Sequence, residues 1–166
     1  AGKSTLFKAL TGTDVYIQDQ LFATLDTTIR KLSLDSSHTI LLSDTVGFIR
    51  KLPHNLVASF KSTLKEVLEA DLILMVLDIS SPQISEHITT IFDVLKEMSA
   101  NKIPIVKVLN KVDLISNGKL IQKLQQSFPD SVTISAKNHL RLSDLKQKII
   151  TMMESNYETV DLKFTY

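Results

Sequence analysis

The sequence contains no cysteine and no tryptophan, and it has only four glycines and four prolines among its 166 residues. Without cysteine there is no disulfide, no thiolate metal ligand and no cysteine nucleophile. Charge of one sign is not in excess either, because 19 Lys and Arg residues are balanced by 18 Asp and Glu residues. The net charge of +1 gives no support for a large basic face, so nucleic-acid binding cannot be inferred from the overall charge, and no DNA partner is expected.

Long hydrophobic runs are also absent. The longest, residues 72–77, lies between Asp71 and Asp78 and has the length of a buried strand. A bilayer-spanning helix needs about 20 apolar residues, so no transmembrane segment is expected. The composition, 43% apolar and 22% charged, is that of one ordinary folded domain. The lack of cysteine fits a reducing cytoplasm, which is the expected location.

Short β-rich runs alternate with amphipathic segments along the chain. Strands are predicted over residues 29–34, 39–43, 72–77, 103–109 and 131–134. Helices are predicted from about residue 5 and over residues 56–68, 84–98, 120–128 and 142–153. The first two strands have hairpin spacing and the others alternate with helices. This pattern predicts an α/β fold with a doubly wound, mostly parallel sheet and one antiparallel edge hairpin, in which ligands bind beyond the carboxyl ends of the strands.

The chain opens with Ala1-Gly2-Lys3-Ser4-Thr5, which matches the second half of a phosphate-binding loop running into a helix. In such a loop the backbone N–H groups face the phosphates, Lys3 reaches the outer phosphates and Ser4 is a ligand of Mg²⁺. The match is short, and a solvated lysine near a helix start is the alternative. The opening glycine of the motif and the strand that feeds the loop would precede Ala1, so we expect this first strand to be missing from the sequence.

A second motif, Asp44-Thr45-Val46-Gly47, follows the predicted strand 39–43. A carboxylate at a strand end can hold Mg²⁺ through water, which is the role expected of Asp44. The N–H of Gly47 can approach a terminal phosphate. The alternative is an ordinary turn, because D-x-x-G is common.

The most specific motif is Asn110-Lys111-Val112-Asp113, directly after the predicted strand 103–109. The Asp113 carboxylate can accept hydrogen bonds from the ring N–H and the exocyclic amine of guanine. Adenine lacks this donor pair and would leave Asp113 unpaired, which is strongly selective. The stem of Lys111 can lie along the base plane, and Asn110 can brace the loop and reach the base edge.

Ser135-Ala136-Lys137 follows the last predicted strand, where a backbone N–H, at Ala136, is expected to meet the guanine oxygen. This tripeptide alone carries little information. Four ordered signals at successive strand ends nevertheless predict a P-loop NTPase fold that binds GTP or GDP with Mg²⁺. Asp78 also ends a predicted strand; it either binds a sugar hydroxyl or caps a turn, and the turn is favoured.

Two longer stretches narrow the prediction to one family. Residues 21–26, LFATLD, and residues 44–56, DTVGFIRKLPHNL, resemble switch I and switch II of the HflX family of translation-associated GTPases, and the similarity covers nearly the whole chain. The resemblance implies that Thr24, next to Phe22 and Ala23, meets Mg²⁺ and the terminal phosphate. Lys3, Thr24 and Gly47 are then the catalytic candidates, and Ser4, Thr24 and Asp44 the metal ligands.

The resemblance also implies a function: GTP hydrolysis that is slow alone and faster on the large ribosomal subunit, used to split or rescue stalled ribosomes. The expected partners are GTP and the RNA and protein of that subunit, and the chain is expected to be a monomer. Two alternatives stay open. One is a guanine-nucleotide-dependent binding module with negligible turnover, since Phe48 stands where many GTPases have Gln. The other is a ribosome-associated GTPase of the Obg or Era type.

The resemblance further implies a domain arrangement. Residues 1–157 are expected to form a G domain, the GTP-binding domain, without its first strand. Residues 158–166 are expected to begin a C-terminal domain that is cut short, so that the sequence is truncated at both ends.

Overall fold

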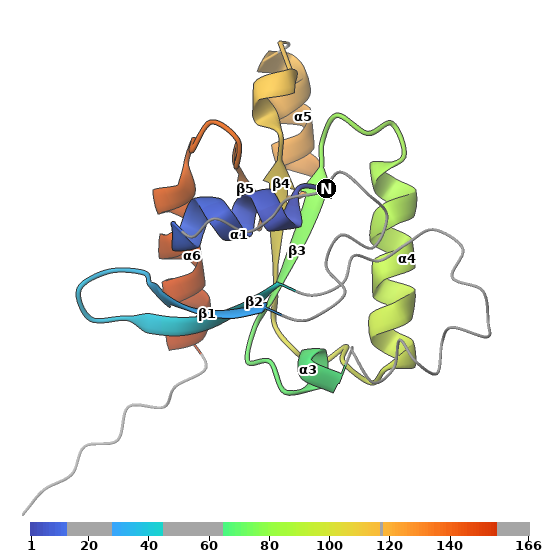
Figure 1. Ribbon diagram of the computed structural model, residues 1–166. Helices are drawn as coiled ribbons and strands as arrows, with labels where there is room; N and C mark the ends of the chain where they lie inside the picture. The colour runs from blue at the N-terminus through green and yellow to red at the C-terminus, as the bar shows by residue number, and fades with distance from the viewer. Residues whose placement is uncertain (13–27, 45–64, 117, 156–166) are drawn as a thin grey trace, which may run out of the picture.

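The computed structural model describes residues 1–12, 28–44, 65–116 and 118–155. In this part of the chain, the strands form two separate sheets (Figure 1). Strands β1 (Thr28–Ser33) and β2 (Thr39–Asp44) make an antiparallel hairpin, with Thr28 opposite Asp44. Strands β3 (Ile73–Asp78), β4 (Ile105–Asn110) and β5 (Val132–Thr133) make a parallel sheet in the order β3-β4-β5. The expected antiparallel hairpin is thereby confirmed.

Helices cover both faces of the parallel sheet (Figure 1). The longer ones are α1 (Lys3–Thr11), α4 (Ile84–Glu97), α5 (Gly118–Ser127) and α6 (Leu142–Glu154). The short ones are α3 (Lys65–Leu68) and the 3₁₀ turn η2 (Val112–Leu114). Within the described residues, no helix has both the length and the apolar character needed to cross a membrane.

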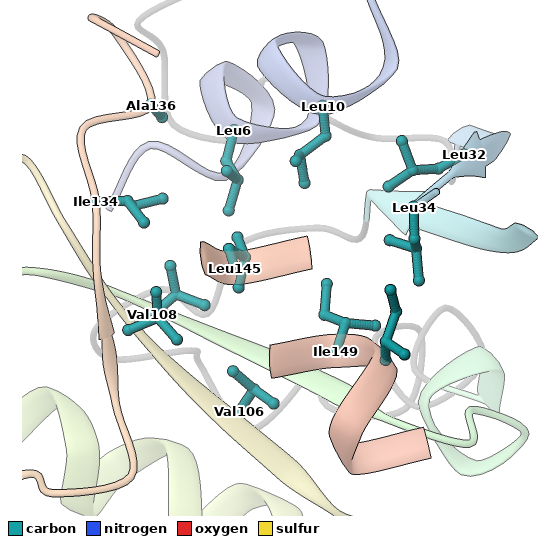
Figure 2. Packing of buried hydrophobic residues seen from close by; sticks show 12 residues of the cluster. Leu6, Leu10, Leu32, Leu34, Val106, Val108, Ile134, Ala136, Leu145 and Ile149 are labelled. Carbon is teal, nitrogen blue, oxygen red and sulfur yellow. The ribbon is translucent and has the colours of Figure 1, made fainter. Parts of the chain in front are cut away.

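Alternate residues of β3 and β4 pack into two hydrophobic cores, one on each face of the sheet, as expected for strands that are apolar on both faces. On one side, Val106 and Val108 pack with residues of α1, the hairpin and α6 (Figure 2). On the other side, Met75 and Leu77 of β3 and Leu109 of β4 are covered by apolar residues of α4 and α5. This arrangement confirms the doubly wound class.

Element boundaries differ from the predicted ones for local reasons. Strand β4 begins at Ile105 rather than 103 because Pro104 has no N–H to donate to a ladder, although its carbonyl accepts from Ile73 N at 2.9 Å. Strand β5 is shorter than predicted because Ser135 turns away to form an antiparallel bridge with Leu140. Of the predicted helix 56–68, only residues 65–68 lie in the described part of the chain, where they form α3.

A cavity of about 590 Å³ separates the hairpin from the parallel sheet. Its lining includes Ile40 and Leu42 of β2 on one side and Leu74 and Val76 of β3 on the other. In the described residues no ladder joins β2 to β3, so each strand has one edge that makes no sheet hydrogen bonds. We call this cavity the inter-sheet slot. Its two walls are apolar, and the β2 and β3 edges that face it make no ladder hydrogen bonds within the described residues.

Candidate functional site

One buried amide joins three of the predicted motifs. Asn110 ends β4 and is only 2% exposed. Its Nδ2 donates a hydrogen bond to the Ala1 carbonyl at 3.0 Å, and its Oδ1 accepts one from Ala136 N at 2.9 Å. The start of the predicted phosphate loop, the N-K-V-D segment and the Ser135–Lys137 segment therefore meet at the carboxyl edge of the parallel sheet, where such sheets bind ligands.

Gly2 is required at the point where α1 meets Asn110. Its φ of +84° lies in the left-handed region that favours glycine, and a Cβ there would lie 2.7 Å from Asn110 Nδ2. The Gly2 carbonyl accepts the first helical hydrogen bond, from Leu6 N at 3.0 Å. Ser4 and Thr5 follow in the first turn of α1, so the helix N-terminus that would face the phosphates lies beside the Asn110 amide.

The N-K-V-D segment is fixed by backbone hydrogen bonds to the strand beside it. Val112 N donates to Ile134 O at 3.1 Å, and Ile134 N donates to Leu109 O at 2.8 Å. Lys111 precedes η2 in a left-handed conformation with φ +70°, and Asp113 is exposed within η2. The backbone thus holds the Asp113 carboxylate at the surface, beside the junction made by Asn110.

Lys111 makes an ion pair that the sequence did not indicate. Its Nζ lies 2.6 Å from Asp78 Oδ2, at the end of β3. Asp78 Oδ1 accepts hydrogen bonds from the backbone N–H of Ser80, at 3.0 Å, and from the Ser80 hydroxyl. Partial burial pushes the pKa of Asp78 upward, but the hydrogen bonds from Lys111 and Ser80 prevail and hold it below its usual value. The turn cap favoured for Asp78 is present, and the ion pair is an addition.

Asp44 ends β2 and is 4% exposed. Its Oδ2 is buried and has no hydrogen-bond partner among the described residues. Lys3 and Asp44 both line the inter-sheet slot. Burial lowers the pKa of the Lys3 ammonium, and the charge of Asp44 opposes that shift. A buried carboxylate oxygen without a partner is costly in a folded protein, so this position suits a cation or a donor.

Other predicted site residues fall into two groups. Ser135 is fully buried, and Lys137 is exposed. The Ala136 N–H, which is expected to meet the guanine oxygen, donates a hydrogen bond to the buried Asn110 Oδ1 in this structure. The remaining candidates lie outside the described residues: Phe22, Ala23, Thr24 and Gly47.

The chain is similar to known GTPases and GTP-binding proteins. The family described as 50S ribosome-binding GTPase matches residues 1–111. GTPase HflX of Caldanaerobacter subterraneus subsp. tengcongensis is 46% identical over 166 residues, which is all of this chain and 37% of that protein. The chain spans a little over a third of the length of this relative and of the HflX of Chlamydia pneumoniae.

Solved structures show the same fold. A GTP-binding protein of Sulfolobus solfataricus in complex with GDP superposes with a TM-score of 0.73 at 28% identity, covering 93% of this chain and 49% of that one. Era in complex with MgGDPNP and nucleotides 1506–1542 of 16S ribosomal RNA gives a TM-score of 0.68 at 26% identity, covering 98% of this chain and 55% of that one.

The fold and the junction at Asn110 together define a G domain of the P-loop class. The chain belongs to the 50S ribosome-binding GTPase family, as a G domain of the HflX type.

Proposed function

We propose that this domain binds GTP and hydrolyses it to GDP and phosphate, and that the protein uses this reaction to act on the ribosome. The observation that carries the proposal is the Asn110 junction, which brings the phosphate loop and both base-recognition segments to one edge of the sheet. The Asp113 carboxylate accepts hydrogen bonds from the ring N–H and the exocyclic amine of guanine, while the aliphatic part of the Lys111 side chain lies along the base. Asn110, Ser135, Ala136 and Lys137 complete the base site.

The phosphates bind at the N-terminus of α1, where the backbone N–H groups of Gly2, Lys3, Ser4 and Thr5 supply donors. The Lys3 ammonium adds positive charge beside the terminal phosphates. The two switch segments complete the proposed phosphate site, with Phe22, Ala23 and Thr24 from switch I and Gly47 from switch II. These groups position the phosphates and stabilise charge that develops on them during transfer to water.

The residues fit Mg²⁺. The unpaired, buried Oδ2 of Asp44 is a hard anionic oxygen of the kind that Mg²⁺ prefers, and Ser4 and Thr24 would supply hydroxyl oxygens. When bound, Mg²⁺ neutralises negative charge on the phosphates.

The partner we propose is the large ribosomal subunit, which the protein contacts through ribosomal RNA and protein. The proposed outcome is the splitting or rescue of stalled ribosomes in the cytoplasm. The proposed active form is a monomer. Membership of the 50S ribosome-binding family supports this partner. The Era relative, which is held with 16S ribosomal RNA, supports RNA contact in general.

We further propose that residues 1–157 form the G domain, that residues 158–166 begin a second domain, and that the inter-sheet slot takes the strand which feeds the phosphate loop. The support for the strand is the slot itself, with apolar walls and two free strand edges.

Phosphate release from GTP, with and without large subunits, tests the function. We expect slow turnover alone and faster turnover with subunits. Asp113→Asn should weaken GTP binding by about 2–4 kcal/mol, as loss of a charge-assisted donor pair predicts. Asp93→Asn, exposed on α4, is the matched control and should bind normally. Guanine-specific binding without turnover under either condition would instead identify a nucleotide-dependent binding module.

A further inference from the structure

Lys111 and Asp113 carry opposite charges and lie two residues apart in the base-recognition segment, yet only one of them has an ion-pair partner. The Lys111 ammonium is paired with Asp78 at 2.6 Å. Asp113 makes no ion pair with any of the described residues and its side chain is exposed. The carboxylate that must meet a ligand is therefore left open, while the neighbouring cation is occupied.

The position of Asp78 follows from the sheet. Strands β3 and β4 are parallel neighbours with Asp78 opposite Asn110, and Ile79 N donates to Asn110 O at 3.1 Å. Asp78 thus lies beside the residue that precedes Lys111. Its Oδ1 is held by Ser80 and its Oδ2 by Lys111, so the two carboxylate oxygens have separate partners and the carboxylate orientation is fixed.

One partner of the ion pair, Lys111, has a strained backbone conformation. Lys111 has a φ of +70°, a left-handed conformation that is unfavourable for a residue with a side chain. The pair is partly shielded from water, with side-chain exposures of 38% for Lys111 and 18% for Asp78. A partly buried pair of this kind holds its geometry better than one between fully exposed side chains.

We propose that Asp78 is a positioning residue for guanine recognition: by holding the Lys111 ammonium, it keeps the Asp113 carboxylate unpaired and open to the donors of the base. The inference rests on the proposed function. Without Asp78, the Lys111 ammonium turns to the other carboxylate of its own segment, Asp113. The ligand amine then has to compete with an internal cation for the same oxygens.

The test compares dissociation constants for GDP, for IDP, which lacks the exocyclic amine, and for pyrophosphate, which lacks the base. Asp78→Asn should weaken GDP binding about tenfold, as the loss of a hydrogen bond to a charged group does, and bring the IDP and GDP constants together. Pyrophosphate binding should be unchanged. Ser80→Ala, which removes a turn hydroxyl but keeps the ion pair, should retain the preference for GDP over IDP.

A double variant separates positioning from a structural role. Lys111→Met changes the base site itself and should weaken GDP and IDP binding alike, so the readout is the ratio of the two dissociation constants. Added to Asp78→Asn, it removes the competing cation and should restore the GDP-over-IDP preference that Asp78→Asn alone has lost. A structural defect at the β3 end would not be rescued in this way. If Asp78→Asn does not fold, Asp78→Ser, whose hydroxyl can still cap the turn at Ser80, is measured in the same way, and an unchanged GDP-over-IDP preference in that variant overturns the proposal.

The two proposals fail differently. A wild-type protein that prefers guanine, together with an Asp78→Asn variant that keeps the same preference, refutes the role of Asp78 only. A wild-type protein with no preference for GDP over IDP or ADP refutes the proposed function itself, and the role of Asp78 with it.

Discussion

Replacing Asn110 with alanine removes the side chain that connects the phosphate loop to the Ser135–Lys137 segment. The Ala136 N–H, now bonded at 2.9 Å, would lose its acceptor inside a residue that is 2% exposed. The Ala1 carbonyl, bonded at 3.0 Å, belongs to an exposed residue and can turn to water. An unsatisfied buried donor costs about 1–3 kcal/mol, so the N–H dominates the expected loss.

With a small packing loss added, Asn110→Ala should lower the free energy of unfolding by about 2–3 kcal/mol. In a domain of this size the melting temperature should fall by roughly 4–10 °C. Urea-induced unfolding followed by circular dichroism measures the first quantity and a thermal melt the second. GDP affinity should fall as well, because the phosphate loop loses its connection to the base site.

Two further variants sharpen this experiment. Asn110→Asp keeps an acceptor for the Ala136 N–H but loses the donor to Ala1, so it should lose less stability than Asn110→Ala. It should lose more nucleotide affinity, because it places a negative charge beside the phosphates. Asn138→Ala, at an exposed position in the same region, is the matched control. An Asn110→Ala variant that melts within about 1 °C of wild type, as surface substitutions do, would refute the reasoning.

Gly2→Ala should destabilise the domain and weaken GDP binding, because the new Cβ would lie 2.7 Å from Asn110 Nδ2 and the φ of +84° disfavours a residue with a side chain. Gly118→Ala is the control, since a Cβ there meets open space, and its melting temperature should match that of wild type. Asp44→Asn should weaken Mg²⁺-dependent GDP binding about tenfold by titration calorimetry, because it removes the anionic oxygen proposed as the metal ligand. The His38 hydrogen bond lowers the pKa of Asp35 to about 2 and raises the pKa of His38. The contribution of Asp35 to stability is thus lost as the pH falls from 3.8 towards 2, and that of His38 as the pH rises above 6.5 through its raised pKa. NMR titration should show a lower His38 pKa in Asp35→Asn, and an unchanged value would contradict the pairing.

The sequence was most informative where a local pattern determines the structure. The hairpin followed from four polar residues between two strands, and the helices on both faces followed from strands that are apolar throughout. The meeting of the Lys3, Asn110 and Ala136 segments followed from the rule that ligands bind at the carboxyl edge of a parallel sheet.

What the sequence did not indicate depends on tertiary contacts. The Asp78–Lys111 pair joins residues 33 positions apart, and only the parallel register of β3 and β4 makes them neighbours. The hydrogen bond from Ala136 N to Asn110 likewise depends on the distance between the end of β4 and the Ser135–Lys137 segment. No periodicity or spacing within either segment reports such a distance.

The residues proposed to bind the nucleotide belong to two sheets, with the inter-sheet slot between these sheets. Asp44 belongs to the hairpin, whereas Asn110 and Asp113 belong to β4 of the parallel sheet and the turn that follows it. The described residues show no ladder between the two sheets, and the hairpin docks through side-chain packing and a hydrogen bond from Lys146 Nζ of α6 to Ser33 O at 3.0 Å. A ligand that reaches both Asp44 and Asp113 spans this division, and its binding energy adds to the energy of docking. Nucleotide binding and the alignment of the two sheets are therefore thermodynamically linked, and each strengthens the other by the same factor.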